Sequence, residues 1–533
     1  MKFYATVLLF QFASLIALAQ FPPQIKNIVV IVQENRTPDN LFHYLTPACP
    51  LPAHATGLTA CTPAPVTSSC YNIASCGVSN QSGVPVAVPL MPVPLAGSAL
   101  PEHSHWSFER MCDPDPTTLA CRNDGAWQIT VPTGGSYGYV ENTAVTNYNG
   151  SAGHLLDPYL TFAKDYGWAN YMYQTNQGPS YSAHQFIFSG TSAATAADDA
   201  ASTFIAEDFA SIYESGCLAL QSGINDLISP LLGSTPKGCS TFGNRSVKEC
   251  PITNTALIYP TDPVGSFCHS HQTMASILDA HSLTWKYYAA VAGSLANAPV
   301  AFQAICDPAF VNPNADPQSA LECTGKEWNA NVDINDMGTD ILRDIFDCKL
   351  ANVSWVTPDD RWSDHAGGND LYGPSWVAAI VNGIGKNPTC PAGSKDAGQT
   401  YWENTAIVVT WDDWGGWADH ELPNFASTLP CKSTDCPADF LYGFRVPMMV
   451  ISAYTPAGLI SNEQHDFGSI LRMIEGINHL TEGQLGFADK RAITDLHEFF
   501  TLATPRTYHI VPAQVNATFF FTLKAPAITP DDE

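Results

Sequence analysis

Two short polar segments combine residue types that can bind a divalent cation. Glu34 and Asn35 follow the apolar run IKNIVVIV, and Asp412 and Asp413 follow the apolar run AIVVTW. Neighbouring carboxylates at the end of a buried strand repel one another, and a cation that accepts oxygen ligands relieves this repulsion. Either pair alone could equally cap a turn or a helix. Because both pairs occupy equivalent strand ends, the sequence favours a metal site that they share.

Ser180 is the candidate nucleophile, and it lies in the segment GPSYSAHQF. We expect a loop to enter a helix at this point. The free N–H groups and the dipole at a helix start favour an anion, which suits a bound phosphate and a covalent phosphoserine. A nearby divalent cation would lower the pKa of the hydroxyl. Taken alone, Ser180 is explained as well by a helix N-cap.

Three histidines are candidates for the remaining steps of phosphoryl transfer. The reaction needs donors for the nonbridging oxygens and a proton for the departing alkoxide. His103 in EHSHW, His271 in CHSHQT and His365 in WSDHAGG carry suitable side chains. A single histidine is more often a hydrogen-bonded structural residue. In two of these motifs a second histidine, His105 or His269, is an equal candidate.

The elements that must position these residues alternate along the chain. Continuous apolar runs rich in β-branched residues are typical of strands covered on both faces, and apolar residues recurring on one face are typical of helices. Such strands are predicted at 25–32, 353–356, 406–411 and 446–452, and such helices at 273–280 and 467–477. The alternation predicts an α/β fold with a mainly parallel central sheet sandwiched by helices. In such sheets, ligands bind beyond the carboxyl ends of the strands, where both acidic pairs lie.

The remaining segments differ from this pattern. A lysine, a short apolar run and the motif Ala17-Leu18-Ala19 predict a signal peptide over residues 1–19 and therefore a secreted or periplasmic protein. Residues 20–504 form the predicted catalytic domain. Within it, residues 46–101 are rich in Pro, Ala, Ser and Val and carry four cysteines, which indicates a disulfide-pinned insertion. Residues 505–533 form a polar and aromatic tail with the character of an edge strand.

The cysteine count and the net charge exclude several classes of function. In an exported chain, 16 cysteines predict up to eight disulfides rather than reactive thiols. Fifty acidic and 23 basic side chains give a net charge of -27, which argues against nucleic-acid partners and against anionic membrane surfaces. The N-terminal apolar run is shorter than a spanning helix requires, so we expect no stable membrane insertion.

Two other functions stay open on these residues. The segment GGSYG fits the GxSxG elbow and would make Ser136 the nucleophile of a metal-independent serine esterase of α/β-hydrolase type. The residues that follow it are not typical of the helix that the elbow requires. Alternatively, the chain is a noncatalytic secreted glycan-binding protein, with acidic clusters holding structural calcium and the tryptophans of WDDWGGW contacting glycans.

The same segments resemble, in sequence and in order, the phosphoesterase family that contains bacterial phospholipases C and respiratory-burst-inhibiting acid phosphatases. VIVQENRTPDNLF resembles the opening strand of the family, GPSYSAHQF its nucleophile segment and NTAIVVTWDDWGGWADH its second acidic pair. The resemblance touches most of residues 25–480 and is most specific from Ser363 to Ile477. It departs at Ser182-Ala183, where relatives often have Pro-Asn.

This resemblance implies an alkaline-phosphatase-like fold and a hydrolase of phosphate esters, of phospholipase C or acid phosphatase type, with a phosphoserine intermediate. The implied metal ligands are Glu34, Asn35, Ser180, Asp412 and Asp413. The implied phosphate-contacting or proton-donating residues are His103, His271 and His365. Oxygen-rich ligands suit calcium, magnesium, manganese or iron, so the identity of the divalent metal ion stays open. The implied partner is a phosphate-ester or phospholipid substrate, and no nucleic acid.

Overall fold

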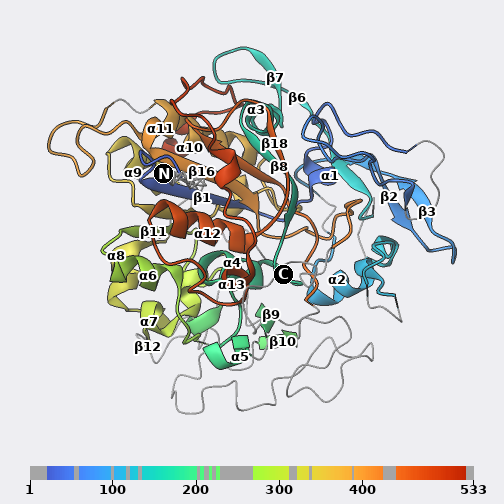
Figure 1. Ribbon diagram of the computed structural model, residues 1–533, viewed down its shortest axis with the longest axis horizontal. Coiled ribbons are helices and arrows are strands. Elements are labelled where there is room, and N and C mark those ends of the chain that lie inside the picture. Colours follow the sequence, from blue (N-terminus) through green and yellow to red (C-terminus); the bar gives the residue numbers. More distant parts are fainter. Residues whose placement is uncertain are drawn as a thin grey trace, which may run out of the picture.

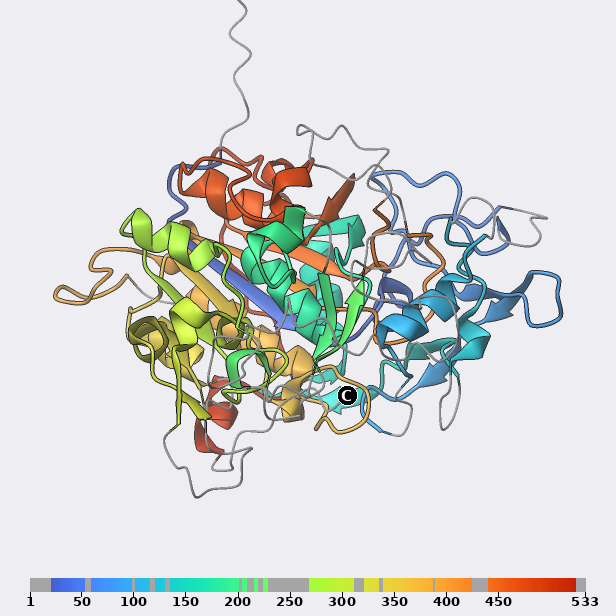
Figure 2. The same ribbon diagram turned by 90° about the horizontal axis from the view of Figure 1, so that it is seen from below.

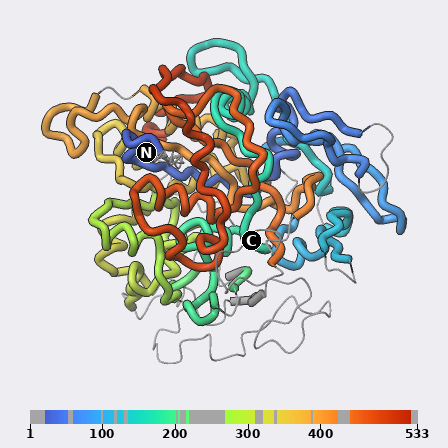
Figure 3. The backbone as a smooth tube through the Cα atoms, viewed as in Figure 1, coloured from blue at the N-terminus to red at the C-terminus, as the bar shows by residue number. Residues whose placement is uncertain are grey.

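The computed structural model describes most of the chain, and Figure 3 traces its backbone. The described residues are 21–52, 59–97, 101–115, 120–129, 135–200, 204–208, 215–218, 224–228, 268–310, 321–334, 339–386, 389–423 and 440–523. The predicted signal peptide over residues 1–19 lies outside them.

An eight-stranded sheet forms the centre of the molecule (Figure 1). In spatial order, its strands are β14 (Val332–Asp333), β11 (Trp285–Tyr288), β15 (Val353–Val356), β1 (Asn27–Gln33), β16 (Thr405–Trp411), β17 (Met448–Ser452), β8 (Gly167–Tyr173) and β18 (Leu459–Asp466). β17 runs antiparallel to both of its neighbours, and the other pairs are parallel. Every residue of β1 and β16 is buried, as continuous apolar runs require.

Helices cover both faces of this sheet. Crossovers between parallel strands are right-handed, so crossovers that run in opposite directions along the sheet place their helices on opposite faces. One layer contains α3 (Asp157–Asp165), α9 (Asp340–Phe346) and α10 (Gly373–Lys386), and the other contains α4 (Ser180–Ser189), α6 (Met274–Ala280) and α8 (Lys326–Asn331). α12 (Phe467–Ile477) packs on α4. Figures 1 and 2 show these two layers, and the predicted α/β class with a mainly parallel central sheet is confirmed.

The elements predicted from apolar patterns are present with small shifts of their ends. The four predicted strands correspond to β1, β15, β16 and β17, and the two predicted helices to α6 and α12. The prediction of an edge strand in the C-terminal tail is wrong for residues 505–523. These residues contain the helix α14 (Ala517–Thr522) instead. The Asn516 side chain caps this helix, and the buried ring of Phe520 packs on Trp362. The aromatic residues of the tail therefore pack on the protein from a helix, and not from a strand.

Disulfides join the cysteines in the described part of the chain. Six pairs form, Cys49–Cys70, Cys61–Cys76, Cys112–Cys121, Cys217–Cys268, Cys306–Cys323 and Cys348–Cys390. The first two lie within the predicted insertion, which also contains β2 (Cys76–Ser79), β3 (Val86–Pro89) and β4 (Met91–Val93). So many disulfides are typical of proteins that fold outside the reducing cytoplasm. Among the described residues, no helix combines the length and apolar character needed to cross a bilayer.

Candidate active site and metal centre

The register between β1 and β16 brings the two acidic pairs together. These strands are parallel and their last residues lie opposite each other, so Glu34 and Asn35 leave the sheet beside Asp412 and Asp413. The Asn35 N–H donates to Asp412 Oδ1 at 3.0 Å. All four side chains are at most 1% exposed. Two acidic pairs that are far apart in the sequence therefore share one buried space at the carboxyl edge of the sheet.

Ser180 reaches the same edge from another strand. It is the first residue of α4, which follows β8, and two antiparallel steps through β17 make β8 parallel to β1 and β16. Ser180 Oγ lies 3.4 Å from Glu34 Oε2, 3.5 Å from Asn35 Oδ1 and 3.2 Å from Asp413 Oδ2. The structure thus brings together the five residues that the sequence assigned to a metal site.

The donor atoms of this group fit a hard divalent cation. Burial and then the charge of Glu34 raise the pKa of Asp412 to about 7, so a positive charge at this point would stabilise the ionised carboxylates. The Asn35 amide can be turned either way. Its Nδ2, turned inward, donates to Asp412 Oδ1 at 2.9 Å and to Glu34 Oε2 at 3.1 Å. Its Oδ1, turned inward, completes a set of oxygen ligands, which calcium, magnesium, manganese and iron accept.

His103 and His365 flank this oxygen-rich group on the side of Asn35. His103 Nε2 lies 2.8 Å from the Asn35 amide nitrogen, and His103 Nδ1 lies 3.0 Å from the Pro101 carbonyl oxygen. In the orientation with Nδ2 toward the carboxylates, Asn35 Oδ1 accepts from His103 Nε2 at 2.8 Å and from His365 Nε2 at 3.1 Å. Burial, His103 and Arg36 lower the pKa of His365 to about 3. Both residues therefore lie beside Asn35, one of the candidate metal ligands.

His105, the alternative to His103, has a different contact. Its Nδ1 lies 2.6 Å from the carbonyl oxygen of Gln177, in the loop that leads to Ser180. This bond connects the start of α2 (His105–Cys112) with the segment that carries the candidate nucleophile. In the structure, His105 supports the position of that loop, and His103 is the histidine that reaches Asn35.

The structure does not bring His271 to the Ser180 group. Its Nδ1 lies 3.1 Å from a neighbouring backbone carbonyl oxygen, and its Nε2 has no hydrogen-bond partner within the described ranges. Together with His269, it lines a cavity of about 340 Å³. His269 contacts the residue that follows the candidate nucleophile, since its Nε2 lies 2.9 Å from the hydroxyl of Tyr181.

His184 joins the site although the sequence analysis gave it no role. It lies one turn after Ser180 on α4, so both side chains project from the same face of the helix. Its Nε2 is 3.5 Å from Glu34 Oε1 and 3.8 Å from Asp412 Oδ2. Burial lowers the pKa of His184 to about 4. The spacing of four residues from the candidate nucleophile was the sequence signal that could have identified it.

Two glycines allow the acidic loop after β16 to approach the rest of the site. Gly415 has a φ of +61°, and a Cβ added there would lie 2.2 Å from the Asn35 carbonyl oxygen. Gly416 has a φ of +69°, and a Cβ there would lie 2.6 Å from the Glu102 carbonyl oxygen. Residues other than glycine rarely adopt this backbone conformation. The glycines of WDDWGGW therefore let one loop contact both the segment of Asn35 and the segment that precedes His103.

Comparison with known proteins identifies the chain. Residues 25–481 match the profile of the phosphoesterase family. This chain belongs to the phosphoesterase family. The resemblance found in the sequence is therefore confirmed, and it covers every residue of the site described above.

Curated relatives of this phosphoesterase are bacterial phospholipases C. They include the non-hemolytic phospholipase C of Burkholderia pseudomallei, 28% identical over 178 residues, which are 30% of this chain and 24% of that protein. The non-hemolytic phospholipase C of Pseudomonas aeruginosa is 24% identical over 43% of this chain and 32% of its own length. Phospholipase C B of Mycobacterium tuberculosis is 24% identical over 44% of each chain. The matched regions span less than half of each relative.

Two solved structures were also matched. One is a protein in the alkaline phosphatase superfamily from Vibrio parahaemolyticus, with a TM-score of 0.29, 10% identity and coverage of 61% of this chain and 60% of that chain. The other is Ps i-CgsB in complex with k-i-k-neocarrahexaose, with a TM-score of 0.28, 11% identity and coverage of 64% and 68%. At these TM-scores neither match supports an argument about function.

The structure disfavours the two other functions considered from the sequence. Ser136 is followed by the strand β5 (Gly138–Val140), whereas a nucleophile elbow needs a helix after the serine. Trp411, Trp414 and Trp417 are at most 1% exposed, so the tryptophans of WDDWGGW pack inside the phosphoesterase and offer no surface to a glycan.

A second cluster of acidic and histidine side chains is satisfied without a metal. Arg445 Nη2 lies 2.9 Å from Asp419 Oδ2, so a guanidinium already supplies the positive charge. His420 Nδ1 lies 2.7 Å from Asp39 Oδ2, and His420 Nε2 lies 3.0 Å from Asn72 Oδ1. Both ring nitrogens are thus occupied. The cluster ties Asn72, in the predicted insertion, to the segment after β16.

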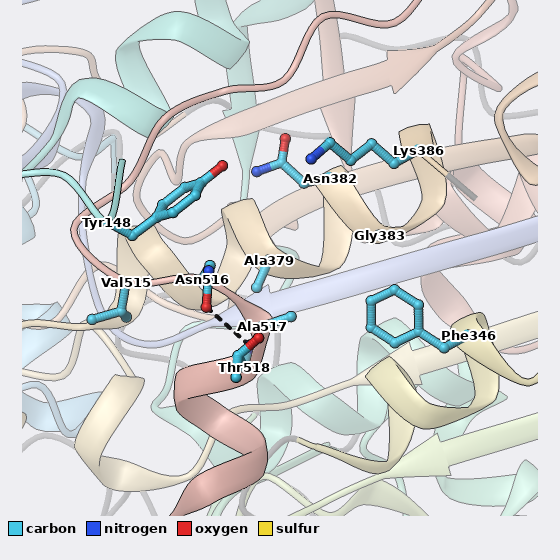
Figure 4. Close-up of a pocket in the computed structure, with 10 residues that line it drawn as sticks. All are labelled: Tyr148, Phe346, Ala379, Asn382, Gly383, Lys386, Val515, Asn516, Ala517 and Thr518. Atoms are coloured by element: carbon cyan, nitrogen blue, oxygen red, sulfur yellow. Dashed lines mark hydrogen bonds between the residues drawn. The ribbon is translucent and has the colours of Figure 1, made fainter. Parts of the chain in front are cut away.

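A surface pocket of about 220 Å³ lies between α10 and the C-terminal helix α14 (Figure 4). Tyr148, Phe346 and Lys386 lie around it, and Asn516 caps α14 at its edge. None of its lining residues belongs to the group around Ser180.

Proposed function

We propose that this phosphoesterase is a secreted or periplasmic, metal-dependent hydrolase of phosphate esters that attacks its substrate with Ser180. The observation that carries the proposal is the approach of Ser180 Oγ to within 3.5 Å of oxygen atoms of Glu34, Asn35 and Asp413. Phospholipid diesters are the proposed substrate class, because the relatives are named phospholipases C.

The proposed metal ligands are Glu34, Asn35, Ser180, Asp412 and Asp413. A divalent cation held there would lower the pKa of the serine hydroxyl and neutralise charge on the phosphoryl oxygens. Asp413 Oδ2, 3.2 Å from Ser180 Oγ, can accept the hydroxyl proton as attack begins. The Gly415 N–H donates to Asp413 Oδ1 at 2.7 Å, which fixes the orientation of this carboxylate.

Ser180 then attacks phosphorus, the bond to the leaving alkoxide breaks, and a phosphoserine forms. The N-terminus of α4 stabilises the negative charge of the phosphoryl group through its free N–H groups and dipole. His365, whose ring stays neutral because its pKa is lowered to about 3, donates a hydrogen bond to the phosphoryl oxygens, and His103, the other histidine beside Asn35, supplies the proton to the alkoxide. Water hydrolyses the phosphoserine and restores the hydroxyl of Ser180.

The test compares Ser180→Ala with the wild type on phosphatidylcholine, bis(p-nitrophenyl) phosphate and p-nitrophenyl phosphate, with and without EDTA. We expect Ser180→Ala and chelation each to lower turnover by at least about 10³-fold. Ser189→Ala, at the other end of the same helix, is the matched control and should keep activity, because its hydroxyl contacts the backbone carbonyls of Gln185 and Thr191 and no residue of the site. Wild-type turnover in Ser180→Ala would refute the nucleophile. Full activity in EDTA would refute metal dependence.

A further inference from the structure

His184 has a ring nitrogen without a partner beside the Ser180 group. The side chain is fully buried, and no hydrogen bond reaches its Nε2 in the described part of the protein. Nε2 faces Glu34 Oε1 at 3.5 Å and Asp412 Oδ2 at 3.8 Å, and the three atoms lie within 4.8 Å of one another. Buried polar atoms are nearly always satisfied, so an unsatisfied one calls for a specific partner.

Tyr287 determines which nitrogen of His184 carries a proton. The Tyr287 hydroxyl lies 2.7 Å from the Ala296 carbonyl oxygen and 3.3 Å from His184 Nδ1. A phenol has one proton, and the carbonyl can only accept, so that proton is used on Ala296. The Tyr287 oxygen then accepts from His184 Nδ1–H. In the neutral ring, the lone pair on Nε2 is therefore directed toward two carboxylates, which is favourable only if a cation lies between them.

Glu34 directs one carboxylate oxygen toward Ser180 and the other toward His184. Its Oε2 faces Ser180 Oγ at 3.4 Å, whereas its Oε1 faces His184 Nε2. Asp412 likewise uses Oδ1 for the Asn35 N–H and directs Oδ2 toward His184. A carboxylate with one oxygen on each side can bridge two cations, which in two-metal sites lie roughly 3.5–4 Å apart.

We propose that His184 Nε2, Glu34 Oε1 and Asp412 Oδ2 bind a second divalent cation, separate from the one at Ser180. Imidazole together with carboxylates suits zinc, iron or manganese better than calcium or magnesium. The inference rests on the proposed function, since Glu34 and Asp412 are shared with the first cation site. In this arrangement, His184 fixes the bridging carboxylate of Glu34 and, through it, the position of the nucleophile's metal.

A protonated His184 is the competing explanation. An imidazolium would offset the charge of the two carboxylates without a second metal, and the protein would then bind a single cation. The two explanations differ in the number of ions bound per chain and in whether those ions interact magnetically.

The test uses the full-length protein, stripped of metal by chelation and reloaded with Mn²⁺. Mass spectrometry of the metal content counts the ions, and electron paramagnetic resonance detects coupling between neighbouring manganese ions. We expect two ions per chain and a coupled spectrum for the wild type, and one ion with an uncoupled spectrum for His184→Leu. His465→Leu is the matched control, because this buried histidine contacts Ser461 and Thr494 instead; it should keep two ions.

The possible outcomes separate the two proposals. One ion per chain in the wild type, or two coupled ions in His184→Leu, would overturn the second site and leave the metal-dependent function intact. A wild type that binds no manganese would overturn both. If His184→Leu does not fold, the ion count and the spectrum of the wild type decide the matter without it.

Discussion

Replacing Gly415 by alanine should weaken the candidate metal site together with the fold around it. The backbone at Gly415 has a φ of +61°, which costs a residue with a Cβ about 1–2 kcal/mol. The added Cβ would also lie 2.2 Å from the Asn35 carbonyl oxygen, and such overpacking costs about 1–3 kcal/mol. We therefore expect the free energy of unfolding to fall by about 2–5 kcal/mol. Because the Gly415 N–H donates to Asp413 Oδ1, a shift of the loop would move this carboxylate, so kcat/KM should fall by roughly 10²-fold.

Gly150→Ala is the matched control for this prediction. Gly150 has a φ of +83°, but no atom lies within 4 Å of an added Cβ, so only the backbone term of about 1–2 kcal/mol applies. Urea denaturation followed by circular dichroism gives the two stabilities, and hydrolysis of bis(p-nitrophenyl) phosphate gives the activities. Equal stabilities for the two variants, with unchanged activity in Gly415→Ala, would refute the close approach of this loop to Asn35.

Two further predictions concern the buried cluster around Arg445. Arg445→Leu leaves Asp419 buried without its partner and should cost about 3–5 kcal/mol, whereas Arg343→Leu breaks an exposed pair and should cost less than about 1 kcal/mol in the same denaturation assay. Equal losses would contradict the structural role of the cluster. Burial alone would lower the pKa of His420, but the charge and hydrogen bond of Asp39 raise it above 6.5. The stabilisation by His420 is therefore full below pH 6.5 and is lost as the pH rises through the folded-state pKa. The loss of stability in His420→Gln should be larger at about pH 5.5 than at about pH 9, and a pH-independent loss would contradict this assignment.

Local sequence patterns predicted the four central strands but missed the two outer strands at each edge of the sheet, β14 and β11 at one edge and β8 and β18 at the other. In β8, Asn170 interrupts the apolar run although the residue is buried. Its side chain accepts from the Asn72 N–H and donates to the Cys70 carbonyl and to Asn462. These partners lie about a hundred or more residues away, so no local pattern indicates that a buried asparagine is satisfied there. β18 is an edge strand with exposed polar residues, which lack the apolar signal altogether.

The site was predictable where its residues follow strands. Glu34 and Asp412 come directly after apolar runs, and parallel strands place such residues at one edge, so sequence alone could associate them. His184 could not be associated with the site from strand ends, because it lies inside a helix, four residues after Ser180. The sequence could not decide whether His269 or His271 belongs to the site. Both lie in a loop, and a loop has no periodic pattern from which its path can be predicted.

The predicted insertion, residues 46–101, ends two residues before His103, and its last part contacts the segment of the candidate metal ligands. Arg36, the residue after Asn35, donates from Nη2 to the Leu95 carbonyl at 2.7 Å and from Nε to the Asp364 carbonyl at 2.7 Å. One buried guanidinium thus holds the end of the insertion and the segment that precedes His365. Arg36 therefore holds both segments beside Asn35, which His103 and His365 flank. One buried side chain thus joins the described end of the insertion to the edge of the sheet that carries the candidate metal ligands.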